Sequence, residues 1–377
     1  MIKFVLIIII ILNFNIVCLA SDVSFIYING SNNNNIKMKN WYEDGVKKLH
    51  PVLVKNFQSN KKIEKYYKKL NNININKAPV IFFWGYNSKT DLNYVKNKNR
   101  FHWNAPFAYF AKKIIIENLH DAIWIQKPNN MLPVLDELNT TIKKEVEKGN
   151  NVVLYGYSAG AFITYEYMFN KLRYINLQEF FKNLNADNDI KMLVKNYPQN
   201  NTCMAALLKN NADIGSLSPS GDFILNTNKK LLNNNYLKLN EITENVCAPN
   251  KNVIGVVNFA NPLPLFYSDL FDDKYELNYY NRLMTKYILE NDMFLISVNF
   301  KEDPLGFSTS QNLKIKEIEK YIKMDIKNPK GVIYNNSNIW AKRLFIFAHL
   351  SYWSARRTFA KGIEKTLIKG YEFQYKE

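Results

Sequence analysis

The chain has 377 residues, 47% of them hydrophobic, so it is long enough to bury the core of a large folded domain. Its 50 Lys and Arg against 33 Asp and Glu give a formal net charge of +17, which suggests peripheral contact with an anionic membrane, with a merely solvated basic surface as the default. The basic residues are scattered Lys without an arginine-rich tract or zinc-finger spacing, which argues against nucleic acid as a partner.

The amino terminus, MIKFVLIIIIILNFNIVCLA, combines one Lys, a long apolar run and small residues before Ser21. This layout predicts a signal peptide over residues 1–20 and therefore export, to a periplasm or to the exterior. The apolar run also approaches the length that spans a bilayer, so an uncleaved membrane anchor is the alternative.

Apolar runs alternate with helical patterns along the chain, which predicts an α/β fold with a mostly parallel sheet of about six strands flanked by helices. The core is expected in two parts, 21–173 and 251–377. The expected strands are 24–28, 80–83, 152–155, 253–257, 294–298 and 331–334, and the expected helices are 41–54, 106–125, 132–147, 161–172, 277–289, 311–322 and 356–369.

An insertion at residues 174–250 separates the two parts of the core. It is rich in Asn and contains the stretch LSPSGD, and we expect it to form a cap or lid, with an ordinary surface subdomain as the alternative. The insertion also holds Cys203 and Cys247, the cysteines that remain once Cys18 leaves with the leader. Export favours a disulfide between them over two free thiols.

The stretch NVVLYGYSAGAFITYEYM, residues 151–168, changes from a strand pattern to a helix pattern at Ser158. Gly156 and Gly160 flank the serine, and their missing side chains permit a sharp turn that exposes its hydroxyl. The N–H of Ala159 would begin the helix, where partial positive charge suits an oxyanion. Ser158 is therefore predicted to be a nucleophile rather than a small residue in a tight turn.

This strand, G-x-S-x-G and helix resemble the nucleophile elbow of the α/β-hydrolase superfamily. In that superfamily an acid and then a histidine follow the serine along the chain. Of His50, His102, His120 and His349, only His349 follows Ser158. It lies in LFIFAHLSYW after the last expected strand, where the fold delivers its base from a loop. A core histidine packed among aromatic residues is the alternative.

The resemblance places the acid at Asp303, in MFLISVNFKEDPLGF, just past the end of an expected strand. Pro304 cannot continue the strand, so the carboxylate would stand in a turn at the edge of the sheet where ligands bind. Asp303 followed by His349 is similar to the N-x-x-x-D-P and H-x-x-Y arrangement of lipase-like hydrolases. The neighbouring Glu302 is expected to face the other way, and Asp269 is the rival acid.

The resemblance also implies a second backbone donor for an oxyanion hole. The stretch FIYINGSNNNN offers the N–H of Ser31 after Asn29 and Gly30, and the stretch VIFFWGYNSK offers the N–H of Tyr86. Each is similar to the His-Gly turn of the hydrolases with another residue in place of His. The helical pattern at 107–123 favours Ser31, and Tyr86 stays as the alternative.

Together these residues predict an exported serine hydrolase that cleaves carboxylic esters, lipid esters among them, through an acyl-enzyme. An acyltransferase, thioesterase or peptidase would use the same triad. A non-catalytic protein of the same fold, bound to an anionic envelope surface, is the alternative of another class. Neither a cofactor nor a metal is expected, because the sequence has no His pair at i and i+4 and no glycine-rich phosphate loop.

Overall fold

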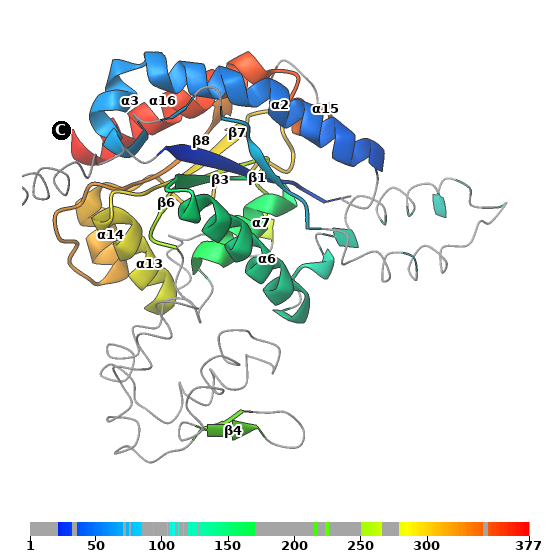
Figure 1. The fold of residues 1–377 in the computed structure, drawn as a ribbon, viewed down its shortest axis with the longest axis horizontal. Helices are drawn as coiled ribbons and strands as arrows, with labels where there is room; N and C mark the ends of the chain where they lie inside the picture. Colours follow the sequence, from blue (N-terminus) through cyan, green and yellow to red (C-terminus); the bar gives the residue numbers. More distant parts are fainter. Residues whose placement is uncertain are drawn as a thin grey trace, which may run out of the picture.

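A six-stranded, wholly parallel sheet lies between two layers of helices (Figure 1), which confirms the predicted α/β fold class. The computed structural model describes residues 22–31, 36–70, 73–74, 77–84, isolated positions between 93 and 126, 128–169, 215–217, 223–225, 250–265, 279–341 and 346–376. In sheet order the strands are β2 (Val80–Phe82), β1 (Val23–Ile28), β3 (Asn151–Tyr157), β6 (Val253–Phe259), β7 (Phe294–Phe300) and β8 (Val332–Ile339).

All six expected strands form, and their burial explains why they are readable in the sequence. β1, β6 and β7 are buried along their whole length, because helices cover both faces of the sheet. β8 continues well past the expected 331–334. Its second half is polar and only partly buried, as suits an edge strand, and so lacks the apolar signal that marks the others.

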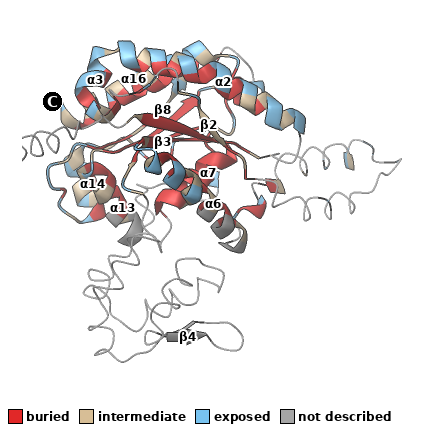
Figure 2. Ribbon diagram, viewed as in Figure 1, coloured by how far each residue is buried: buried red, intermediate tan, exposed pale blue. Residues whose placement is uncertain are grey.

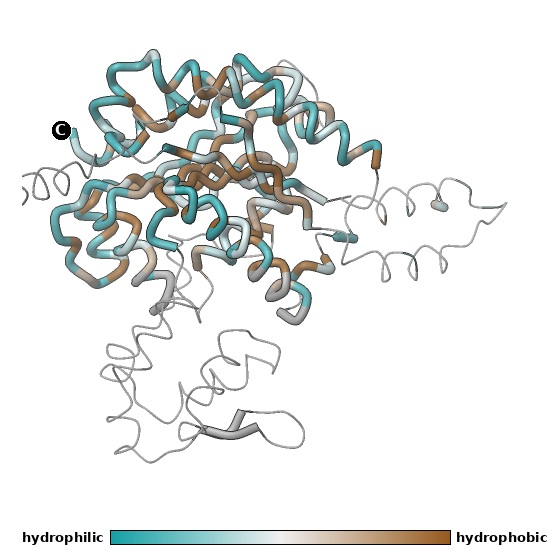
Figure 3. Tube along the Cα trace, viewed as in Figure 1, coloured by the Kyte–Doolittle hydropathy of each residue, from teal (hydrophilic) through white to brown (hydrophobic). Residues whose placement is uncertain are grey.

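The helices divide between the two faces of the sheet (Figure 1). One layer contains α2 (Ile36–Ser59), α3 (Lys61–Tyr66), α15 (Ile346–Leu350) and α16 (Arg356–Tyr375), and the other contains α6 (Pro128–Glu147), α7 (Ala159–Phe169), α13 (Tyr279–Glu290) and α14 (Ile315–Ile322). Each layer buries its own apolar cluster against the sheet (Figures 2 and 3). Two short 3₁₀ turns, η1 (Lys68–Leu70) and η4 (Leu263–Leu265), complete the described elements.

The chain reverses its direction across the sheet at β1, which neighbours β2 on one side and β3 on the other. α2, which follows β1, covers the opposite face from α7, which follows β3 (Figure 1). The two connections therefore leave the sheet in opposite directions. In open α/β sheets, the crevice outside the carboxyl ends of two such strands is where ligands bind.

Several predicted features lie outside the described residues. They include the signal peptide 1–20, most of the expected helix 106–125, and Cys203 and Cys247. Within the expected insertion 174–250, the structure describes Asn250 and an antiparallel pair, β4 (Gly215–Leu217) and β5 (Phe223–Leu225). Among the helices in the described parts, none has the length and apolar character to cross a bilayer.

Candidate active site

Ser158 lies at the joint between β3 and α7, at the carboxyl edge of the sheet. Its φ of 52° is in the left-handed region, which residues other than glycine rarely adopt. Two backbone hydrogen bonds hold this conformation: the N–H of Ser158 donates to the carbonyl of Phe259 (3.0 Å), and its carbonyl accepts from the N–H of Ala161 (2.8 Å). The turn is therefore fixed from both sides, by a strand and by a helix.

The two glycines beside Ser158 allow α7 to lie against the strands. A methyl group on Gly160 would overlap the carbonyl oxygen of Ile28 at the end of β1. A methyl group on Gly156 would come within 2.8 Å of the Cα atom of Ala161. Both positions are thus restricted to glycine by the close approach of backbones, as the sharp turn predicted from the sequence requires.

Ser158, His349 and Asp303 form a continuous chain of hydrogen bonds. The distance from Ser158 Oγ to His349 Nε2 is 3.2 Å, and His349 Nδ1 lies 3.0 Å and 3.2 Å from the two carboxylate oxygens of Asp303. All three residues are buried. A neutral imidazole with its proton on Nδ1 donates to the carboxylate and accepts the serine proton at Nε2. The structure thus brings together residues that follow three different strands.

Asp303 is held in the turn after β7 by donors other than His349. The N–H of Leu305 donates to Asp303 Oδ1 (2.9 Å), and the hydroxyl of Tyr352 donates to Oδ2 (2.8 Å). The same hydroxyl accepts the N–H of Phe300 (2.9 Å). Burial, followed by the negative charge of Asp303, raises the pKa of the Tyr352 hydroxyl, so this group stays protonated and donates. The carboxylate is oriented from two sides.

His349 lies in the five-residue helix α15, so the expectation that a loop delivers it is wrong. Ala348 in this helix and Tyr352 in the turn after it are fully buried and belong to the same apolar cluster. The hydroxyl of Tyr157 donates to the carbonyl of His349 (3.0 Å). Burial, with the charge of Asp303 next in size, raises the pKa of Tyr157, which keeps this donor protonated. The backbone that carries the imidazole is thereby tied to β3.

The loop after β1 lies directly against Ser158. A methyl group on Gly30 would come within 3.0 Å of the Cβ atom of Ser158, and Ser31 follows at the end of the described segment. The indole N–H of Trp84 donates to the carbonyl of Asn29 (2.8 Å), so the second candidate stretch supports the first. Tyr86, the alternative donor, lies outside the described residues.

The first turn of α7 supplies the other expected donor. Ala159 is the first residue of α7, so its N–H has no acceptor within the helix. It follows Ser158 directly, at the positive end of the helix dipole. Ala159 is bonded to Ser158, and Ser31 follows Gly30, which lies against Ser158. The oxyanion hole expected from the sequence stays a prediction.

A buried amide network, which sequence reasoning missed, fixes the loop that contains Asp303. Asn299 Nδ2 donates to the carbonyl of Phe307 (2.7 Å), and Asn299 Oδ1 accepts the N–H of Asn261 (3.1 Å). Asn261 Nδ2 in turn donates to Thr309 Oγ1 (2.8 Å). The available signal is that Asn261 and Asn299 lie near the carboxyl ends of two largely apolar strands, where a buried amide needs partners.

His50 and His120, the other histidines that the structure describes, have neighbours of their own. His50 is buried beneath β1, with Nδ1 3.1 Å from the hydroxyl of Tyr27 and Nε2 3.0 Å from the carbonyl of Lys77. Burial lowers the pKa of His50, so the ring is neutral. His120 lies beside Asp121, and His102 is outside the described residues.

The neighbouring acidic residues do not replace Asp303. Glu302 accepts the N–H of Ala341 (2.9 Å), so it faces the end of β8 as expected, and Asp269 lies outside the described residues. In the part of the chain that the structure describes, no group of three or more His, Cys, Asp or Glu residues is placed to hold a metal ion.

The arrangement has the parts of a nucleophilic site: a hydroxyl, a base that can accept its proton and a carboxylate that orients the base. Comparisons with family models, with curated proteins and with solved structures find no match. The functional argument therefore rests on the geometry of these residues.

Replacing Tyr352 by Phe should destabilise the protein. The variant leaves the N–H of Phe300 buried without its acceptor, and we expect the free energy of unfolding, measured with urea, to fall by about 1–3 kcal/mol. Tyr155→Phe is the matched control, because Tyr155 is also fully buried but its hydroxyl has no hydrogen-bond partner. An equal loss in both variants would show that the Tyr352 hydroxyl contributes nothing specific.

Proposed function

We propose that this protein is a serine hydrolase of the α/β-hydrolase type that cleaves carboxylic esters. The observation that carries the proposal is the hydrogen-bond chain from Ser158 through His349 to Asp303. Ser158 Oγ attacks the acyl carbonyl while His349 Nε2 takes its proton. His349 then returns that proton to the leaving alcohol, and an acyl-enzyme remains.

Water completes the reaction by the same steps. His349 takes a proton from the water as its oxygen attacks the acyl-enzyme, and the proton passes to Ser158 Oγ as the acid leaves. Asp303 keeps its negative charge throughout and stabilises the imidazolium. The N–H groups of Ala159 and Ser31 are the donors proposed for the oxyanion of each tetrahedral intermediate, with the dipole of α7 adding to the first.

Exposed apolar side chains around the site favour an apolar acyl substrate, such as a lipid ester. Phe307 is 36% exposed on the loop that contains Asp303. Phe347 and Leu350 are 68% and 39% exposed, and they flank His349 in α15. Water-facing apolar residues on the very segments that hold the triad have no role in the core. They are available to contact an acyl chain.

The same geometry serves acyl transfer if an alcohol other than water accepts the acyl group, and it serves thioesters or peptides if the pocket admits them. A protein of this fold that only binds a surface would have no use for the hydrogen bond between Ser158 and His349. This hydrogen bond favours a catalytic role over binding alone.

A fluorophosphonate probe should label the protein at Ser158. We expect Ser158→Ala to abolish labelling, and His349→Ala to lower kcat on a soluble ester at least about 10³-fold, because the serine loses its base. His120→Ala is the control and should retain labelling. His50 is unsuitable as a control because it is buried and hydrogen-bonded. Labelling that persists in Ser158→Ala would refute the assignment.

Substitutions at Asp303 and Glu302 distinguish the orientation of His349 from a general effect of negative charge. Asp303→Asn should lower kcat by about 10⁴-fold, because the amide favours the wrong tautomer of His349. Glu302→Gln removes the same charge one residue away and should change kcat less than about tenfold, since Glu302 binds the end of β8. The measurement is ester hydrolysis by folded variants, and a larger loss in Glu302→Gln would reverse the roles of the two acids.

A further inference from the structure

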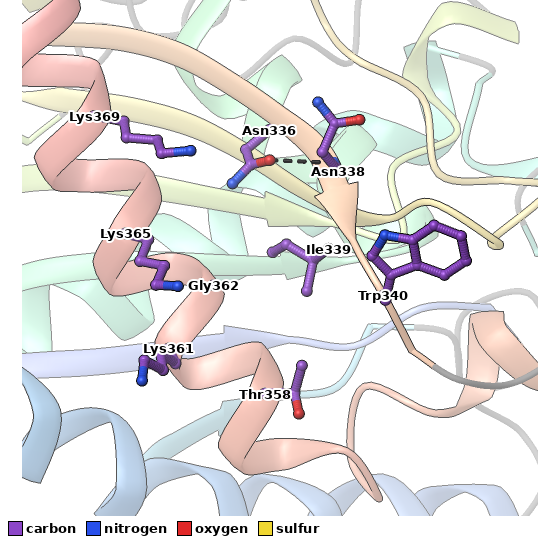
Figure 4. A pocket seen from close by; sticks show the side chains of 9 residues that line it. All are labelled: Asn336, Asn338, Ile339, Trp340, Thr358, Lys361, Gly362, Lys365 and Lys369. Carbon is purple, nitrogen blue, oxygen red and sulfur yellow. Dashed lines mark hydrogen bonds between the residues drawn. The ribbon is translucent and has the colours of Figure 1, made fainter.

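A groove of about 340 Å³ runs between α16 and the edge strand β8. Figure 4 shows the labelled side chains of α16 beside those of β8 that line the groove, with Lys369 extending toward Asn336. Its polar and aromatic lining consists of Thr358, Lys361, Lys365 and Lys369 on the helix, with Asn336, Asn338 and Trp340 on and just after the strand. The groove therefore combines a row of positive charges with amide groups and one indole.

The three lysines, called here the lysine row, lie one turn apart on α16 and are all exposed. Like charges at this spacing repel one another, so the row costs stability in the free protein. Among the described residues, none of the three forms an ion pair. Nearby carboxylates of α16 already have partners, since Glu364 accepts from Asn60 and Glu372 binds Lys62 at 2.9 Å.

The packing of α16 holds the lysine row close to β8. A methyl group on Gly362 would overlap the side chain of Ile339, so the helix lies directly on the strand at this point. Asn336 and Asn338 come from the same strand, and an amide can donate to an anion. Asn336 Nδ2 donates one N–H to Thr366 Oγ1 (2.9 Å), which orients the amide and leaves its second N–H for a ligand. The floor of the groove is thus fixed, and lysines and amides line the same space.

Trp340 ends the groove at the carboxyl end of β8. Its side chain is 60% exposed, and the ammonium group of Lys301 lies 4.7 Å from the centroid of the indole. An exposed tryptophan beside lysines is the combination that proteins place at the boundary between lipid headgroups and hydrocarbon. Such a side chain has little use toward a small soluble anion.

We propose that this groove binds the phosphate headgroup of an anionic phospholipid and so docks the protein on an anionic bilayer. The lysine row and the two amides can donate hydrogen bonds to a phosphate, and Trp340 can lie in the interfacial layer of the bilayer. The net charge of +17 favours approach to an anionic membrane surface. The inference goes beyond ester hydrolysis, because docking requires no residue of the triad.

Docking at the groove brings one edge of the sheet to the lipid. Trp340 follows the carboxyl end of β8, the same edge at which Asp303 and His349 lie. The exposed side chain of Phe347, next along the chain in α15, can then meet the bilayer as well. The surface would supply the site with ester substrates in the membrane.

The test is cosedimentation of the protein with phosphatidylcholine vesicles, with and without phosphatidylserine. Replacing Lys361, Lys365 and Lys369 together by Gln should weaken binding to the phosphatidylserine vesicles about a hundredfold. The matched control replaces Lys316, Lys320 and Lys327 by Gln. These are exposed lysines of α14 and the following loop, in the opposite layer of helices, and their loss should weaken binding severalfold at most. Trp340→Phe should lose the change in tryptophan fluorescence that accompanies binding.

An equal loss in the two triple variants, or equal binding to vesicles without phosphatidylserine, would overturn the proposal. Inorganic phosphate that displaces the protein from vesicles at micromolar concentration would indicate a free anion as the ligand instead. Thermal unfolding checks that each variant folds. Ser158→Ala should bind vesicles normally, and the lysine-row variant should hydrolyse a soluble ester normally, so docking and hydrolysis can fail separately.

Discussion

The close approach of α7 to the end of β1 is the constraint on which the candidate site depends. The carbonyl of Ile28 leaves no space for a side chain at Gly160, and this contact lets the helix begin immediately after Ser158. The serine then takes a left-handed conformation, which costs about 1–3 kcal/mol and persists only because Phe259 and Ala161 bind its backbone. The same approach sets Gly30 against the serine. A looser helix would therefore displace the hydroxyl and the neighbouring donors together.

The spacing of the strands explains why three separate segments are needed. Neighbouring strands lie about 4.8 Å apart, and β6 separates β3 from β7, so the strand before Asp303 is about 10 Å from the strand before Ser158. The imidazole of His349 spans this distance with a hydrogen bond at each end. Its position in turn depends on α15 and on the hydroxyl of Tyr157. Rigidity at the site is thus assembled from contacts between loops.

Features encoded locally could be predicted from the sequence, and features that depend on distant contacts could not. Apolar runs mark the strands, apart from the polar second half of β8, and the glycines lie two residues either side of Ser158, so the sequence alone reveals both features. His349 follows from chain order alone. The role of Tyr352 depends on Phe300, 52 residues away, and no periodic pattern reveals it. The contact of Trp84 with Asn29 likewise joins two stretches that are 55 residues apart in the sequence.

The distribution of charge also depends on distant contacts. The sequence gives the net charge, but only the folded chain shows which lysines lie together on the surface. An edge strand must discourage pairing with other strands, and polar residues serve that purpose in β8 at Asn336 and Asn338. Protection of the sheet edge does not account for the lysine row. The row belongs to helix α16 and not to the edge strand whose backbone groups are open to pairing. Repulsion within the row would be relieved by one neighbouring carboxylate. Glu364 and Glu372 of α16 instead bind Asn60 and Lys62, at and just after the start of α3, so they do not relieve the repulsion within the lysine row.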